Sequence, residues 1–458
     1  MVRSPTQRLQ TSRTTTASAP ALGPTQHPLT LLDGPPGDRH CPICRGVEEA
    51  ERGFFSWFGI ESYGEVNVQA QLRAAMGMCP AHSRRLVDEV GEGNVMNVVA
   101  GEALNGARDA LSGALRPGRC PACEAVAVAV DAAHHLVEGR LRDPASAARY
   151  GEHAGLCFAH FLGATRILEP ATLKILAERL LITLSSDNGL KVEALAGGDP
   201  DAPRRAVRRE RLTDHEPAGS TLEGLCVRLS VDACPVCAAT GLIERRYLDW
   251  YVHESLAGGD SLATDAGEMC SVHLHDLARR DPAAALGGAQ RKRATRTDEL
   301  QQLLDSVAQP PPSPRRGRRT GSDDLDRART RLLAARTCPA CHACAGVEAS
   351  QLELVSTSLT LAPVRDCYER GHGLCVRHAL RVPADRAAHA VKRHADARVR
   401  LLAWEVSQAI RKQAWAYRHE PDGPEHDAWL RALVQIDGRV LCGGPARREH
   451  DAHRLDRA

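Results

Sequence analysis

A cysteine–histidine pattern that occurs four times constrains this chain more than any other feature. Each copy begins with Cys-Pro-x-Cys and continues, after a gap of 32 to 34 residues, with Cys-x-x-His. Four copies whose gap varies so little are not explained by chance, so we interpret the chain as four repeated units. The four motifs use twelve of the sixteen cysteines.

Three thiolates and one imidazole per unit are a ligand set that suits Zn²⁺, which prefers tetrahedral nitrogen and sulfur ligation. We therefore expect each unit to hold one zinc ion with its own four ligands. Four protein ligands leave no open position, so the sites are predicted to be structural and not catalytic. The predicted ligands are Cys41, Cys44, Cys79 and His82 in unit 1; Cys120, Cys123, Cys157 and His160 in unit 2; Cys234, Cys237, Cys270 and His273 in unit 3; and Cys338, Cys341, Cys375 and His378 in unit 4.

The residues beside the ligands repeat as well. A proline follows the first cysteine of every unit, and proline at the first position of a helix costs no hydrogen bond. A glycine lies two or three residues before every third cysteine, which suits a tight turn or a positive φ. These residues are Pro42, Pro121, Pro235 and Pro339, and Gly77, Gly155, Gly267 and Gly373.

Apolar residues at helical spacing follow the motifs, and no convincing alternating run predicts a strand. We predict a mostly α fold of four zinc-stapled helical units, each built as knuckle, helix, loop, second knuckle and helix, and arranged as two two-unit modules. The predicted helices include 124–141, 238–256, 94–115, 171–184, 297–307 and 388–417.

Stretches rich in proline, glycine and charge predict solvated linkers between these units. The predicted division is a disordered tail at 1–38, zinc unit 1 at 39–116, zinc unit 2 at 117–200, a linker at 201–222, zinc unit 3 at 223–308, a disordered linker at 309–326, zinc unit 4 at 327–445 and a tail at 446–458.

The charge balance narrows the function classes. The chain has 59 basic and 57 acidic residues, a formal net charge of +2, so bulk charge does not hold it to nucleic acid or to a membrane. No apolar stretch is long enough for a transmembrane helix, and the N-terminal segment lacks the apolar core of a secretory signal. We therefore expect a cytoplasmic, reducing location, in which cysteines bind metals or do redox chemistry.

Alternatives to structural zinc stay open. An iron–sulfur cluster accepts histidine in place of cysteine, and in unit 4 Cys344 follows Cys341 at the same spacing. Cys344 and Cys367 are otherwise extra thiols beside a zinc site. A thiol redox or metal sensor is a further alternative, and so is nucleic-acid binding through the arginine clusters at 204–211, 291–296 and 315–319.

Other residues are assigned structural roles. The run from Phe54 to Phe58 is expected to pack in the core, and the helix around Trp404, Trp415 and Tyr417 to pack on unit 4. Histidines outside the motifs are expected to be solvated surface residues: His134, His135, His419, His426, His450 and His453. No catalytic or nucleotide-binding motif is present, so we lean against an enzyme.

The motif pair, with its glycine and apolar residue before Cys-x-x-His, resembles a group of uncharacterised bacterial proteins with paired CPxC and GxCxxH motifs, thought to be zinc-binding repeats. The resemblance covers about residues 40–200 and 225–418 and implies metal binding. Taken together, these features predict a zinc-binding, non-enzymatic scaffold or interaction protein with an unidentified protein partner.

Overall fold

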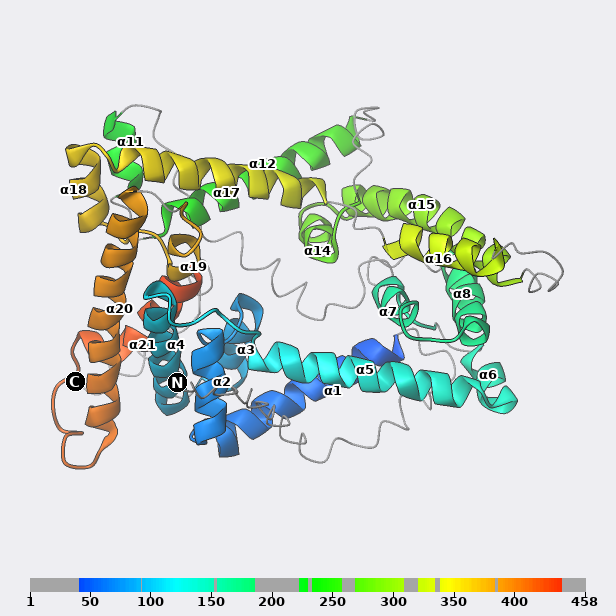
Figure 1. Cartoon of the computed structure of the whole chain (residues 1–458), viewed down its shortest axis with the longest axis horizontal. Coiled ribbons are helices and arrows are strands. Elements are labelled where there is room, and N and C mark those ends of the chain that lie inside the picture. Colours follow the sequence, from blue (N-terminus) through cyan, green and yellow to red (C-terminus); the bar gives the residue numbers. More distant parts are fainter. Residues whose placement is uncertain are drawn as a thin grey trace, which may run out of the picture.

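The chain folds almost entirely into helices. The computed structural model describes residues 41–438 except 92, 152–154, 186–221, 230–232, 258–267, 309–319, 334–337 and 384–385, and within these residues it contains no β-strand (Figure 1). This confirms the predicted mostly α class. None of the described helices is both long and apolar enough to cross a membrane.

The proline after each first cysteine begins a helix, as predicted. The first cysteine is the N-cap residue in every case, because its extended backbone precedes the first helical turn. These helices pack in pairs, the first along the second and the third along the fourth. They are α1 (Pro42–Trp57), α5 (Pro121–Leu141), α12 (Pro235–Leu256) and α17 (Pro339–Ser358).

Each third cysteine is likewise the N-cap of a helix. The glycine before it has a positive φ at Gly77, Gly155 and Gly373, which confirms the tight turn at three positions. A side chain at Gly373 would meet the ring of His394, so both backbone angle and space require glycine there. Gly267 lies outside the described residues. The helices are α3 (Pro80–Glu89), α7 (Phe158–Ala164), α14 (Ser271–Arg280) and α19 (Val376–Ala379).

A longer helix follows each of these short ones, close to the predicted ranges except that the third begins well before residue 297. The long helices are α4 (Gly93–Leu111), α8 (Pro170–Ser185), α15 (Pro282–Ala308) and α20 (Arg386–Gln413). The remaining elements are a π-helical turn (Phe58–Ser62), α2 (Val66–Ala75), α6 (Pro144–Tyr150), α11 (Leu222–Leu229), α16 (Thr320–Leu333), α18 (Ala362–Arg370), a 3₁₀ turn (Pro424–Asp427) and α21 (Ala428–Asp437).

Part of one predicted linker is helical. Helix α16 begins at Thr320, inside the stretch 309–326, and packs against α15. The rest of that predicted linker, 309–319, lies outside the described residues. The same is true of the predicted tails, 1–38 and 446–458, and of 201–221 in the other predicted linker. The predicted unit boundaries stay predictions.

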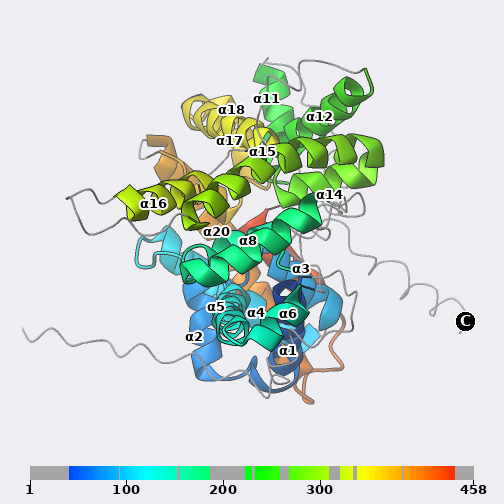
Figure 2. The ribbon, with the colours of Figure 1, turned by 90° about the vertical axis from the view of Figure 1, so that its right-hand side faces the viewer.

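The first half of the described chain (41–185) and the second half (222–438) pack through their long helices. Helix α4 lies along α20, and α8 lies against α15 (Figures 1 and 2). Small residues on α4 allow a close approach, since Ala100, Ala103 and Ala107 are fully buried and Gly101 faces Val406 of α20. The long helix of unit 1 thus meets that of unit 4, and the long helix of unit 2 meets that of unit 3. If units 1 and 2 are matched to units 3 and 4, each of these two contacts corresponds to the other, so the two halves are related as in a symmetric pair.

The apolar core runs across both halves. One cluster of buried side chains contains Leu176 of α8 together with Ala285 of α15, and another contains Leu104 of α4 together with Val399 of α20. The two halves therefore share apolar cores, a point that the sequence left open.

The aromatic residues divide between core and surface. Phe54, Phe55 and Phe58 are buried, as expected. The helix around Trp404 packs on α19 and α21 of unit 4, as expected, and also on α4. The side chains of Trp404 and Trp415 are themselves 59% and 74% exposed. The helix buries Val399, Leu402 and Val406 and leaves Trp404 outside.

Candidate metal centres

The sixteen predicted ligands gather into four groups, but the groups do not follow the units. Each Cys-Pro-x-Cys pair meets the Cys-x-x-His of the neighbouring unit, so the prediction that a unit holds an ion with its own four residues is wrong. The groups are Cys41, Cys44, Cys157 and His160 (first outer site); Cys79, His82, Cys120 and Cys123 (first inner site); Cys234, Cys237, Cys375 and His378 (second outer site); and Cys270, His273, Cys338 and Cys341 (second inner site).

Helix direction explains the exchange. The histidine of unit 1, His82, contacts Glu51 and Phe55, which lie ten and fourteen residues after Cys41 on α1. Ten helical residues span about 15 Å, so His82 lies too far from Cys41 to share an ion with it. Helix α5 begins beside His82, at Cys120, and its own residue His134 lies beside His160 and the start of α1. The two helices therefore run antiparallel, and each brings its cysteines to the other unit's histidine.

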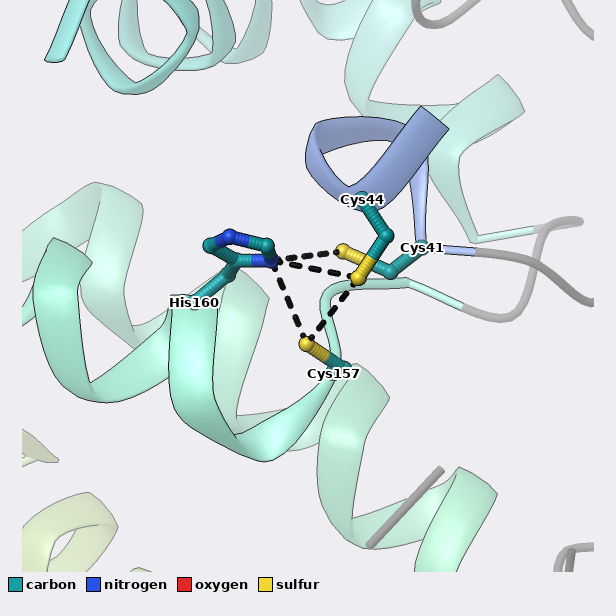
Figure 3. Close-up of side chains that lie close together, drawn as sticks. All are labelled: Cys41, Cys44, Cys157 and His160. Atoms are coloured by element: carbon teal, nitrogen blue, oxygen red, sulfur yellow. Dashed lines mark hydrogen bonds between the residues drawn. The ribbon is translucent and has the colours of Figure 1, made fainter. Parts of the chain in front are cut away.

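The first outer site shows the geometry that all four share. The Nδ1 atom of His160 lies 3.5 Å from the sulfur of Cys41 and 3.3 Å from those of Cys44 and Cys157 (Figure 3). The sulfurs of Cys44 and Cys157 are 3.6 Å apart. In all four groups the nitrogen–sulfur distances are 3.1 to 3.5 Å, and the sulfur–sulfur distances that join the two motifs are 3.6 to 3.9 Å.

These distances match a tetrahedron around one ion. With zinc–sulfur bonds of about 2.3 Å and zinc–nitrogen bonds of about 2.0 Å, tetrahedral ligands lie about 3.5 Å apart for nitrogen and sulfur and about 3.8 Å apart for two sulfurs. All four ligand atoms of each group lie within 4.8 Å of one another. The donors present therefore fit a single tetrahedral metal ion at each of the four places.

The ligands stand at helix N-termini throughout. In each motif the first ligand is the N-cap residue and the second is the third residue of the helix, so every site receives two helix starts. The partial positive charge of a helix N-terminus stabilises a thiolate. The motif spacing of two intervening residues follows from this, because the N-cap and third positions face the same way.

The pKa shifts in the first inner site indicate that positive charge is stabilised beside its sulfur atoms. Burial acts to lower the pKa of His82, but hydrogen bonds to Cys120, Cys79 and Glu51 outweigh it and raise that pKa to about 12. Hydrogen bonds from Cys120 and Cys123 lower the pKa of Cys79, while hydrogen bonds to Cys123 and Cys79 raise that of Cys120. These shifts favour a proton on the imidazole of His82 beside the thiolate of Cys79. A divalent cation would replace that proton and allow the remaining thiols to ionise.

Sequence reasoning missed a glutamate that accompanies three of the histidines, buried in two cases and partly buried in the third. The Nε2 atom of His82 lies 3.0 Å from a carboxylate oxygen of Glu51, that of His273 lies 2.6 Å from Glu244, and that of His378 lies 3.0 Å from Glu348. Each glutamate comes ten residues after the first cysteine of the histidine's own unit. The repeated offset was visible in the sequence and could have identified these residues.

The other cysteines that the structure describes do not join a complete group of four. Cys344 lies with Glu244 and His273 in a smaller group of three, on the Nε2 side of the histidine ring. Cys367 of α18 lies next to Cys226 of α11, since their hydrogen bond raises the pKa of Cys226. That Cys344 and Cys367 are extra thiols stays a prediction, and Cys442 lies outside the described residues.

Two charged residues connect sites in different halves. Arg296 of α15 is buried against Glu268, just before Cys270, and its guanidinium lies 4.8 Å from the ring centre of Phe158, next to Cys157. Asp437 at the end of α21 accepts a hydrogen bond from Ser83, next to His82, and pairs with Arg377, next to His378. Each outer site is thereby linked to the inner site of the opposite half.

Two expectations for surface residues need correction. His134 is buried and donates from Nε2 to the backbone oxygen of His160 at 2.9 Å, so it is not a solvated residue, whereas His135 is exposed. Arg296, part of one predicted phosphate-binding cluster, is buried and ion-paired with Glu268 and Glu299. His419 and His426 are exposed as expected, and His450 and His453 lie outside the described residues.

Comparison with known proteins yields no relative. No protein-family model matches the chain, and neither a curated protein nor a solved structure matches it.

Proposed function

We propose that this chain is a zinc-binding, non-enzymatic scaffold whose fold is closed by four structural Cys₃His sites. The observation that carries the proposal is the pairing of ligands between units. Each ion would join two motifs separated along the chain, so the four ions would fix how α1 meets α5 and how α12 meets α17.

Zinc is favoured by the size and chemistry of the groups. Tetrahedral sulfur and nitrogen ligation is typical of zinc or of iron–sulfur clusters. A cluster with two or more irons separates its protein ligands, whereas here all four ligand atoms lie within 4.8 Å of one another. That spacing leaves room for one ion, and it is the same in the second inner site, beside which Cys344 had left a cluster open as an alternative.

A structural role is favoured over catalysis by the number of ligands. Each group supplies four protein donors, which fills a tetrahedron and leaves no position for a substrate or a reactive water. The carboxylates nearest to the groups, such as Glu51 and Glu244, face the histidine rings and do not stand free beside the metal position.

The interaction part of the proposal rests on the exposed aromatic residues on α20 and in the turn that follows it. Trp404, Trp415 and Tyr417 are exposed in a chain with only 3% aromatic residues. Tryptophan and tyrosine on a surface are typical of protein-binding positions. Nucleic-acid binding gains no such support, because Arg296 is engaged inside the protein.

The first test is the metal content and absorption spectrum of the purified full-length protein. We expect about four zinc ions per chain and no charge-transfer band near 400 nm. Removal of the ions by a strong chelator should abolish the helical circular dichroism of both halves, because structural zinc contributes roughly 10–16 kcal/mol of apparent free energy in small domains. Bound iron, or a chain that keeps its melting temperature without metal, would overturn the proposal.

A further inference from the structure

The four sites differ in what holds the second nitrogen of the histidine. In each site Nδ1 faces the sulfurs, which leaves Nε2 to donate a hydrogen bond elsewhere. In three sites the acceptor is the carboxylate of Glu51, Glu244 or Glu348. A carboxylate partner keeps the proton on Nε2, so that Nδ1 presents its lone pair to the metal, and it makes that nitrogen a stronger donor.

The first outer site has valine in place of this glutamate. Val130 lies ten residues after Cys120, where the other three units carry Glu51, Glu244 and Glu348. Among the described residues, no carboxylate lies within ion-pair distance of His160. The helix face is nevertheless the equivalent one, because His134, one turn after Val130, contacts His160 as Phe55 contacts His82.

The position fourteen residues after the first cysteine confirms the alignment of the four helices. It is occupied by Phe55, His134, Leu248 and Leu352, and all four side chains are buried. Val130, one turn earlier, is partly buried against the apolar core. The missing carboxylate is thus a local substitution within a preserved packing arrangement and not a shift of the helix.

We propose that Glu51, Glu244 and Glu348 are positioning residues for the metal-binding histidines, and that the first outer site, which lacks one, holds an exchangeable zinc ion. This inference rests on the proposed zinc-binding function and extends it to regulation. The three carboxylate-supported ions keep the helices paired, while the ion on Cys41, Cys44, Cys157 and His160 leaves and returns with zinc availability. Loss of a second-shell carboxylate typically lowers metal affinity by 10 to 100-fold.

The experiment follows zinc release from the fully loaded, full-length protein into an excess of a colorimetric chelator. In the wild type we expect one equivalent to leave at least about 10-fold faster than the other three. Val130→Glu should slow that equivalent until it joins the others, whereas the apolar control Val130→Leu should leave it fast. In the reverse direction, Glu348→Val should produce a second fast equivalent, with Glu348→Gln in between.

Accessibility offers a rival explanation that the same experiment decides. Cys341 in the second inner site is the exposed ligand, so access of the chelator alone would make that site release first. A fast equivalent that Val130→Glu leaves unchanged would overturn the proposal. Simultaneous loss of all four ions from the wild type would also overturn it.

Two further measurements separate the possible failures. The melting temperature of the zinc-loaded variants should change little, so a variant that alters stability without altering release would show that the glutamates are merely structural. If Val130→Glu does not load four ions, Glu348→Val still decides, because unchanged release in that variant contradicts the positioning role. A wild-type chain without zinc would instead refute the proposed function itself.

Discussion

The two halves of the molecule place their ligands in the same nested order but tolerate very different lengths of chain between the units. In the first half the inner histidine is joined to the inner cysteine pair by residues 83–119, and in the second half by residues 274–337, which include α15 and α16. Within every unit, in contrast, the gap between the two motifs stays between 32 and 34 residues.

The contrast between the variable length of chain between units and the constant gap within a unit shows what fixes that gap. Since the two motifs of a unit lie in different ligand groups, the gap does not reflect ligand sharing. It reflects the packing of the Cys-x-x-His helix against the middle of the unit's first helix, where the histidine contacts residues ten and fourteen positions after the first cysteine. The chain between units only has to return to a site that the helices have already positioned, so it accepts an insertion.

The largest expected effect is on the number of bound ions when whole motifs are removed. Replacing Cys79 and His82 together with Cys120 and Cys123 should cost one zinc ion per chain, because all four residues serve the first inner site. Replacing Cys79 and His82 together with Cys41 and Cys44 should cost two. Metal analysis of the two quadruple variants checks this, and the opposite result would restore pairing within units.

A pair of helix glycines tests how closely the first half is packed. A side chain at Gly106 of α4 would overlap the backbone oxygen of Arg73 in α2, whereas one at Gly53 of α1 meets nothing within 4 Å. Gly106→Ala should therefore destabilise the zinc-loaded protein by about 3 kcal/mol. The control Gly53→Ala should stabilise it by roughly 0.5 kcal/mol. Chemical unfolding measures both, and equal effects would contradict the close approach of α2 and α4.

The link between halves at Asp437 should have a smaller effect. Asp437→Asn removes the charge that Arg377 meets, at an expected cost of about 1.5 kcal/mol in the free energy of unfolding. Asp427→Asn is the matched control near the other end of α21, because Asp427 is exposed and its pair with Arg431 contributes roughly 0.3 kcal/mol. Equal free energies of unfolding for the two variants would mean that Asp437 of α21 does not stabilise the contact between the two sites.

The smallest effect is expected for the extra thiols. Cys344→Ser and Cys367→Ser should each retain the full number of ions and change the free energy of unfolding by about 0.5 kcal/mol or less, as is typical outside essential contacts. Metal analysis with thermal unfolding checks this. Loss of an ion in Cys344→Ser would assign that thiol to the second inner site and break the equivalence of the two halves.

Much of the local structure could be predicted, because it is encoded by neighbouring residues. Pro42 and Pro121 predict their helix starts, and Gly77 and Gly155 their turns, from conformational preferences alone. All sixteen candidate ligands lie in the four groups. Helix α16 was hidden by its charged composition, although Leu325, Ala328 and Leu332 recur at helical spacing and pack inward.

The pairing of ligands could not be predicted from spacing. It depends on the antiparallel packing of α1 with α5 and of α12 with α17, a relation between residues far apart in the chain. Both possible partners of His82, the pair at Cys41 and the pair at Cys120, lie at similar distances along the sequence. The structure decides between the two pairs because it places His82 beside Glu51, ten residues along α1 from Cys41 and close to Cys120.

Helix α4 packs on α20, and α8 packs on α15. The two halves of this single chain are therefore arranged like the two subunits of a symmetric dimer. In a true dimer of identical subunits every amino-acid change occurs twice, so neither copy of a site can specialise alone. Here Val130 occupies one half while its counterpart Glu348 occupies the other. In a single polypeptide, two equivalent sites can thus evolve different roles. The two halves are also always made in a one-to-one ratio, because they are parts of the same chain.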